Sequence, residues 1–160
     1  MQGDRTVLEH LQTALTIELT AVNQYLLHAH VLEDWGLSRL GARMREEMAE
    51  EQGHAHRLLE RILFLDGTPD VSKLNDVGQG NSLRGILEAD LRDEYEARTY
   101  YTRAAEVAAE RSDLGTRELF RSLIADEEGH IDYIESQLNL IDLIGEAGYA
   151  QIQVSRNTQD

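Results

Sequence analysis

Two Glu-x-x-His pairs, Glu51 with His54 and Glu127 with His130, carry the clearest chemical signal in this chain. Residues i and i+3 share one face of an α-helix, so each pair can direct a carboxylate and an imidazole at one metal ion. A lone glutamate precedes each pair by 33 residues, and the whole triplet recurs at an offset of 76 residues. Such a set, drawn from four helices, is typical of di-iron or di-manganese carboxylate bundles. The predicted ligands are Glu18, Glu51, His54, Glu94, Glu127 and His130.

The predicted charge balance supports two divalent cations. Four ionised glutamates in an apolar interior need compensation, and two divalent ions supply four positive charges. Oxygen-rich ligation with one imidazole per metal suits iron or manganese better than structural zinc. We expect Glu51 and Glu127 to bridge the metals, and Glu18 and Glu94 to be terminal ligands. Two adjacent ferrous ions could then each give one electron to dioxygen.

Two tyrosines obey the same offset as the candidate ligands. Tyr25 lies seven residues after Glu18, and Tyr101 lies seven residues after Glu94. Seven residues are about two helical turns, so each tyrosine is expected on the same face as its glutamate. The spacing leaves two interpretations open, a core side chain whose hydroxyl needs a partner, or a redox participant.

Other polar residues fall outside the predicted core stripes and are interpreted as surface residues. They include four histidines and a run of glutamates that is expected to form a solvated face, although in a hollow assembly that face could collect iron. The histidines are His10, His28, His30 and His56, and the glutamates are Glu46, Glu47 and Glu50.

Four apolar stripes at heptad-like spacing predict four long helices, with every candidate ligand on the core-facing side. The segment Tyr149–Arg156 is apolar on one side and predicts a short fifth helix. It would have nothing to bury against in a four-helix monomer, which indicates assembly. We expect an all-α fold in a single domain, residues 1–160, with helices at about 5–35, 39–66, 83–111, 116–144 and 148–155.

The connections between these helices predict the topology. Short turns near Gly36 and Ser112–Gly115 make the first two helices antiparallel neighbours, and likewise the last two long ones. Ser38 and Ser82 are predicted N-caps. The segment 66–81 has no periodicity, and about 15 extended residues reach about 50 Å, more than the roughly 40 Å of a 27-residue helix. It can therefore cross the whole bundle, which predicts a ferritin-like four-helix bundle with a long crossover.

Composition excludes several classes of function. The net charge is −15 and the pI is about 4.7, which argue against binding nucleic acid or an anionic membrane surface. The absence of cysteine excludes disulfides and thiolate metal sites, and it fits a reducing compartment. Because the start MQGDRTV has no apolar signal region, we expect a cytoplasmic protein without a membrane span.

The chain resembles the bacterioferritins over nearly its whole length. The resemblance is carried by MQGD, ELTAVNQY, DWGLSRL, EEQGHAHRLLERILFLDG and DEEGHIDYIE. All six predicted ligands match the di-iron ligands of that family, and Tyr25 matches an aromatic residue beside its di-iron site. The resemblance implies a homo-oligomeric shell of 24 subunits that oxidises Fe²⁺ with O₂ or peroxide and stores a ferric mineral.

One position departs from the haem-binding members of this family. Those members carry a methionine directly after the bridging glutamate of the second helix, and two such methionines from a subunit pair bind one haem. Gln52 stands there in this chain, and an amide is a poor substitute for thioether ligation of haem iron. Met48 lies about 6 Å away along the helix. The resemblance is thus to the haem-free, ferroxidase-type subunit, which can co-assemble with a haem-binding sibling.

Two other functions are compatible with the same ligands. One is a di-iron or di-manganese peroxidase or catalase that stores no mineral, although the lack of cysteine weighs against the rubrerythrin form. The other is a shell subunit with an idle site, against which the complete ligand set argues. Particle size distinguishes these hypotheses, because iron storage requires a large hollow shell and a peroxidase or catalase does not.

Overall fold

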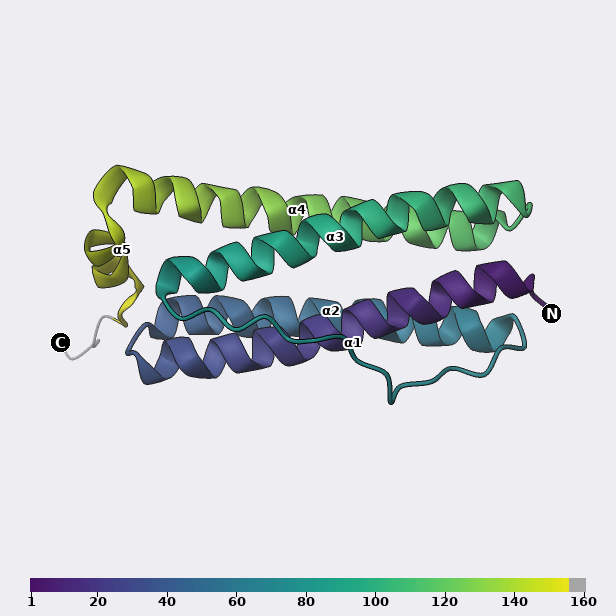
Figure 1. Cartoon of the computed structure of the whole chain (residues 1–160), viewed down its shortest axis with the longest axis horizontal. Coiled ribbons are helices and arrows are strands. Elements are labelled where there is room, and N and C mark those ends of the chain that lie inside the picture. Colours follow the sequence, from purple (N-terminus) through teal and green to yellow (C-terminus); the bar gives the residue numbers. More distant parts are fainter. Residues whose placement is uncertain (156–160) are drawn as a thin grey trace.

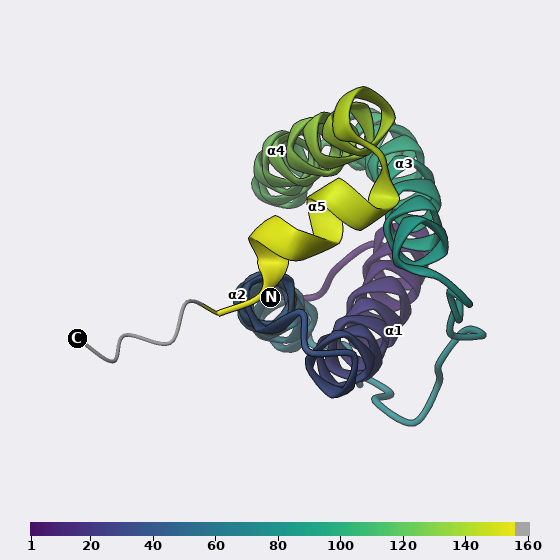
Figure 2. The ribbon, with the colours of Figure 1, turned by 90° about the vertical axis from the view of Figure 1, so that its left-hand side faces the viewer.

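The computed structural model describes residues 1–155 and consists of helices, with no strand in that range. Residues 1–155 form four long helices and a short fifth helix; the long helices lie side by side, and the short one closes one end of the bundle (Figures 1 and 2). This confirms the predicted all-α, ferritin-like four-helix bundle. Residues 156–160 of the predicted domain lie outside the described part. The helices are α1 (Arg5–Asp34), α2 (Ser38–Phe64), α3 (Leu83–Glu110), α4 (Leu114–Ile144) and α5 (Glu146–Gln153).

Side-chain caps begin three of the long helices. Asp4 accepts hydrogen bonds from two backbone amides of α1, and Ser82 accepts one from α3, as its predicted role requires. Asp113 caps α4, so this helix starts two residues before the predicted position. The expectation for α2 was wrong, because Ser38 is its first residue and the N-cap position is held by Leu37, which offers no side-chain acceptor.

The apolar core is divided into two clusters by the middle of the bundle. One cluster extends from Val7 to Leu15 on α1 and reaches Phe120 on α4. The other extends from Tyr25 to Leu32 on α1 and includes Ile134 on α4. The predicted metal ligands lie between these clusters, so apolar packing at both ends fixes the separation of the four helices at the site.

The long crossover runs along the bundle beside α1, which confirms the predicted topology (Figures 1 and 2). Side chains of α1 replace the regular hydrogen bonds that this segment lacks. Gln12 exchanges two 2.8 Å hydrogen bonds with the backbone of Asp70. Further along, the hydroxyl of Thr20 accepts from the amide of Asn75 at 2.9 Å. An irregular segment is thus held by one polar edge of one helix.

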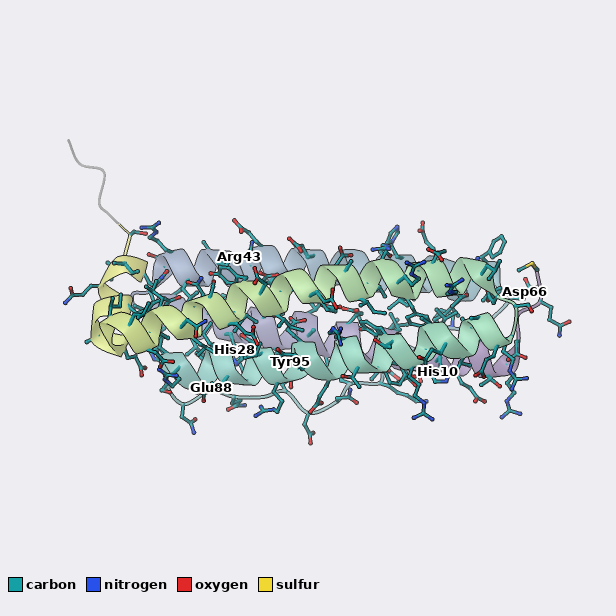
Figure 3. The ribbon with its side chains drawn as sticks, turned by 90° about the horizontal axis from the view of Figure 1, so that it is seen from above. His10, His28, Arg43, Asp66, Glu88 and Tyr95 are labelled. Carbon is teal, nitrogen blue, oxygen red and sulfur yellow. The ribbon has the colours of Figure 1, made fainter. Side chains whose placement is uncertain are left out.

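His28 is not a surface residue, contrary to the sequence-based expectation. It lies among the helices with 1% of its surface exposed (Figure 3). Its Nδ1 lies 2.8 Å from Asp90 Oδ1 on α3, and its Nε2 lies 2.9 Å from the carbonyl oxygen of Gly78 in the crossover. Gln24 also bonds to both Asp90 and Gly78. This buried network joins α1, α3 and the crossover.

The short helix α5 packs within its own chain, which corrects the expectation that it lacks a surface to bury against. It lies across the end of the bundle (Figure 2). Tyr149 is fully buried in the second apolar cluster, and its hydroxyl donates to Gln137 on α4 at 2.8 Å. Ile144 and Ile152 beside it remain exposed. Within residues 1–155, no helix is both long and apolar enough to span a membrane.

Candidate metal centre

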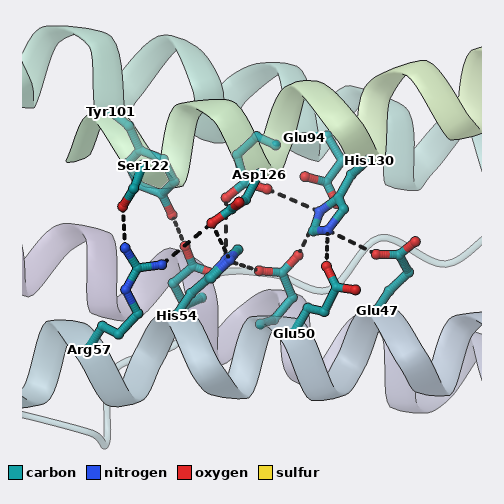
Figure 4. Close-up of polar contacts among 12 residues, drawn as sticks. Glu47, Glu50, His54, Arg57, Glu94, Tyr101, Ser122, Asp126 and His130 are labelled. Atoms are coloured by element: carbon teal, nitrogen blue, oxygen red, sulfur yellow. Dashed lines mark hydrogen bonds and ion pairs between the residues drawn. The ribbon is translucent and has the colours of Figure 1, made fainter. Parts of the chain in front are cut away.

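All six predicted ligands lie together between the two apolar clusters of the bundle, and Figure 4 shows His54, Glu94 and His130 among them. They form two overlapping groups, in each of which one potential ligand atom per residue lies within 4.8 Å of the others. Glu51 and Glu127 belong to both groups, as expected for residues placed between two metal positions. Glu18 and His54 complete one group, and Glu94 and His130 complete the other.

The six side chains are buried and in direct contact. His54 Nδ1 lies 2.8 Å from Glu51 Oε2, and His130 Nδ1 lies 3.2 Å from both Glu51 Oε1 and Glu127 Oε2. None of the six is more than 5% exposed. Each histidine therefore directs Nδ1 toward the shared glutamates.

Crowding and burial shift the proton equilibria of this cluster when no metal is present. Burial, reinforced by the charge of Glu51, raises the pKa of Glu18 well above its usual range. Burial also raises the pKa of Glu127 to about 10, against the opposing effect of His130. Burial alone would lower the pKa of His54, but hydrogen bonds with Glu18 and Glu51 raise it to about 11. In the metal-free cluster, protons therefore supply the positive charge that the glutamates require.

Several buried ligand atoms have no hydrogen-bond partner. They are Glu51 Oε1, both carboxylate oxygens of Glu127 and His130 Nδ1. A buried polar atom without a partner costs about 1–3 kcal/mol, and a bound cation would satisfy several at once. Four carboxylates with two imidazoles are a donor set that suits iron or manganese. The residues present thus fit a pair of divalent metal ions.

The two tyrosines form reciprocal hydrogen bonds between α1 and α3. The hydroxyl of Tyr25 donates to Glu94, and that of Tyr101 donates to Glu18 Oε1 at 2.5 Å. The residues related by the 76-residue offset therefore make equivalent hydrogen bonds, each tyrosine with the glutamate of the other helix. Both hydroxyls have the partner that a buried phenol needs, and each fixes the orientation of one predicted terminal ligand.

The structure adds Glu47, which sequence analysis assigned to a solvated face. Glu46 and Glu50 are exposed as expected, whereas Glu47 is buried against His130. The missed signal was spacing, since Glu47 lies four residues before Glu51 and seven before His54. Those intervals place it on the same helix face as the ligands.

A cavity of about 370 Å³ leads to the centre between α1 and α3. Its inner wall includes Glu18 and Glu94, and its lining extends to the exposed residue Asp76 in the crossover. Asp93 and Glu96 on α3 add two further carboxylates. The cavity therefore connects the buried ligands to an acidic part of the surface.

Comparison with known proteins agrees with this geometry. The family model described as "Ferritin-like domain" matches residues 8–144. Bacterioferritin from Brucella melitensis is 44% identical over 155 residues, covering 97% of this chain and 96% of the relative. Bacterioferritin from Rhodobacter capsulatus is 43% identical with the same coverage. The fold and the site thus define a ferritin-like protein.

A solved structure narrows this class. Rhodobacter capsulatus bacterioferritin superposes with a TM-score of 0.97 at 42% identity, covering 100% of both chains. That structure has a metal-free dinuclear site and a haem iron. With the near full-length identity to curated relatives, the chain belongs to the bacterioferritin family.

Replacing Tyr101 with phenylalanine is expected to destabilise the metal-free protein. The change leaves buried Glu18 without its donor, a loss of about 1–3 kcal/mol, which corresponds to a melting-temperature decrease of a few degrees. Adding Mn²⁺ should narrow the difference, because a cation would then hold the carboxylate. Tyr100→Phe is the matched control, since that hydroxyl contacts half-buried His10 instead. Equal decreases in both variants would contradict the assigned contact.

Proposed function

We propose that this protein oxidises Fe²⁺ at a di-iron centre within each subunit and stores the ferric product in a hollow shell. The observation that carries this proposal is the pair of overlapping ligand groups sharing Glu51 and Glu127. We infer a single ferritin-like domain, residues 1–160, acting in the cytoplasm, where a cysteine-free chain fits a reducing compartment.

The chain's own residues would divide the work as follows. Glu51 and Glu127 would be shared by two metal positions, with Glu18 and His54 completing one and Glu94 and His130 the other. Two ferrous ions held there would supply the two electrons that reduce O₂ or peroxide. The apolar clusters on either side hold the helices at a fixed separation, and Tyr25 and Tyr101 orient the carboxylates of Glu94 and Glu18.

The negative charge of the protein favours the delivery of cations to the site. The cavity between α1 and α3 is lined by Asp76, Asp93 and Glu96 toward the surface, and by the buried glutamates at its inner end. A chain with a net charge of −15 attracts divalent cations, and an acidic cleft raises their local concentration. We infer that Fe²⁺ reaches the centre by this route.

Exposed apolar side chains support assembly into a shell. Leu143 is 81% exposed, and Leu63, Phe64, Leu114 and Trp35 are also exposed. Large apolar side chains exposed in this way are candidate contact sites for other chains. We propose a homo-oligomer of 24 subunits, with co-assembly of a haem-binding sibling as a variant of the same architecture.

Substituting either member of the second Glu-x-x-His pair tests the centre. Glu127→Ala and His130→Ala should each slow O₂-dependent Fe²⁺ oxidation by more than about a hundredfold, because even outer partners of metal ligands are worth 10- to 100-fold. Stopped-flow absorbance of the ferric product measures the rate. His56→Ala is the control, since His56 is exposed and pairs with the exposed residue Glu60. Undiminished rates in both ligand variants would refute the assignment.

Light scattering tests the shell. At micromolar concentration the purified protein should have the molar mass of a closed particle of 24 subunits, because its exposed apolar residues need partners. A population of monomers or dimers only would contradict storage, and would favour the alternative of a di-iron or di-manganese peroxidase or catalase.

Haem content tests position 52. Gln52 is exposed on α2, where a partner subunit can approach, and it lacks the thioether that the family's haem requires. Homomeric protein should therefore purify with little haem, whereas Gln52→Met should bind haem with the absorption spectrum of bis-methionine ligation. Stoichiometric haem in the unsubstituted protein would show that another residue, with Met48 the nearest methionine, is the ligand.

A further inference from the structure

The 76-residue offset extends beyond the ligands to the carboxylates outside them. Glu50 precedes Glu51 on α2, and Asp126 precedes Glu127 on α4 at the equivalent position. Each carboxylate reaches the histidine of the other helix (Figure 4). Glu50 Oε2 lies 2.9 Å from His130 Nε2, and Asp126 Oδ2 lies 3.3 Å from His54 Nε2.

Glu47 breaks this symmetry. Its Oε2 lies 3.0 Å from His130 Nε2 as an ion-pair contact, while the hydrogen bond of this nitrogen is with Glu50 Oε2 at 2.9 Å. The residue at the equivalent position on α4 is Leu123, a buried member of the apolar core. The Glu47 side chain is 3% exposed, against 53% for Glu50. His54 therefore has no buried outer carboxylate, whereas His130 has one.

Arg43 holds Glu47 in this position. It forms an ion pair with Glu47 Oε1 from one turn earlier on α2. The Arg43 guanidinium also lies 4.6 Å from the ring centroid of Tyr133 on α4, which adds a cation–π contact across the two helices. The Glu47 carboxylate is thus fixed between an arginine and the imidazole, while Asp126 is 44% exposed and shared with Arg57.

The arrangement determines the roles of the two nitrogens of His130. A carboxylate only accepts, so Nε2, which is hydrogen-bonded to Glu50 and also faces Glu47, must carry a hydrogen. The lone pair available for a metal is then on Nδ1, which faces Glu51 and Glu127 without a hydrogen-bond partner. A carboxylate behind a metal-bound histidine fixes its tautomer and ring orientation and makes it a stronger ligand.

We propose that Glu47 is a positioning residue that acts through His130, and that it makes the metal position of Glu94 and His130 bind divalent cations more tightly than the position of Glu18 and His54. This proposal rests on the metal centre proposed above, and it adds that the two metal positions differ in their affinity for divalent cations. Burial strengthens the effect, because the interaction of Glu47 with the imidazole is little screened by water.

Titration of the metal-free assembled protein with Co²⁺ measures this inequality without any turnover. Calorimetry and the visible spectrum of bound Co²⁺ should give two ions per subunit with different affinities. Glu47→Gln, which keeps the shape and removes the charge, should weaken the tighter position by about 10- to 100-fold and leave the other unchanged. If the unsubstituted protein binds no Co²⁺, the proposed metal centre itself fails.

Matched variants locate the effect. Glu50→Gln should weaken the same position less, because Glu50 is largely exposed, and Asp126→Asn should affect only the weaker position. Arg43→Gln gives a second route to the same readout, since it frees Glu47 without altering the carboxylate. When His54 is already replaced by alanine, Glu47→Gln should still lower the Co²⁺ affinity of the tighter position by its full factor. When His130 is already replaced by alanine, Glu47→Gln should not change the Co²⁺ affinity further.

Three results would overturn the proposal. Glu47→Gln could leave both affinities unchanged, or weaken both positions equally, which would indicate a general structural role. It could also abolish a third Co²⁺ ion while preserving the first two, which would make Glu47 a ligand of its own metal. Circular dichroism and particle size of each variant establish that the compared proteins are folded and assembled.

Discussion

The burial of four glutamates in the middle of a helical bundle is the constraint on which the rest of this structure depends. Glu18, Glu51, Glu94 and Glu127 lie where an ordinary bundle would place leucine, and isolated buried charges are strongly unfavourable. Protons on the cluster, two imidazoles and two phenol hydroxyls compensate for them in the metal-free protein. The apolar clusters at both ends supply the favourable burial that keeps this polar layer in place.

The two halves of the chain repeat one design, and the exceptions occur where their surroundings differ. Tyr25 and Tyr101 make matched contacts across the repeat. His28 and Asp90, by contrast, correspond to the buried alanines Ala104 and Ala14. Only α1 and α3 border the crossover in this way, and the buried His28–Asp90 pair satisfies the carbonyl of Gly78 there. The repeat breaks because one side of the bundle must hold an irregular segment.

Much of the fold and the meeting of the six candidate ligands could be predicted from the sequence, because both depend on periodicity. Glu-x-x-His spacing on a helix leaves little freedom in where the side chains point, and the length of the segment 66–81 restricts how it can connect two helices. His28 and Tyr149 were misjudged because their burial depends on the crossover and on the packing of α5, about which periodicity within one helix carries no information. Glu47 was misjudged although its spacing from Glu51 and His54 places it on the helix face of the candidate ligands.

The two faces of the site have different surroundings, and its two histidines contact carboxylates outside the candidate ligands on one face only. Between α1 and α3 lies the acidic cavity that ends at Glu18 and Glu94. Between α2 and α4 lie the outer carboxylates Glu50 and Asp126, with buried Glu47 only behind His130 (Figure 4). A cation arriving through the cavity would thus meet two candidate positions with equal numbers of potential ligands, of which only the His130 position has a buried carboxylate behind its histidine. Because the difference lies outside the ligands, one substitution on α2 can change it while the ligand set stays intact.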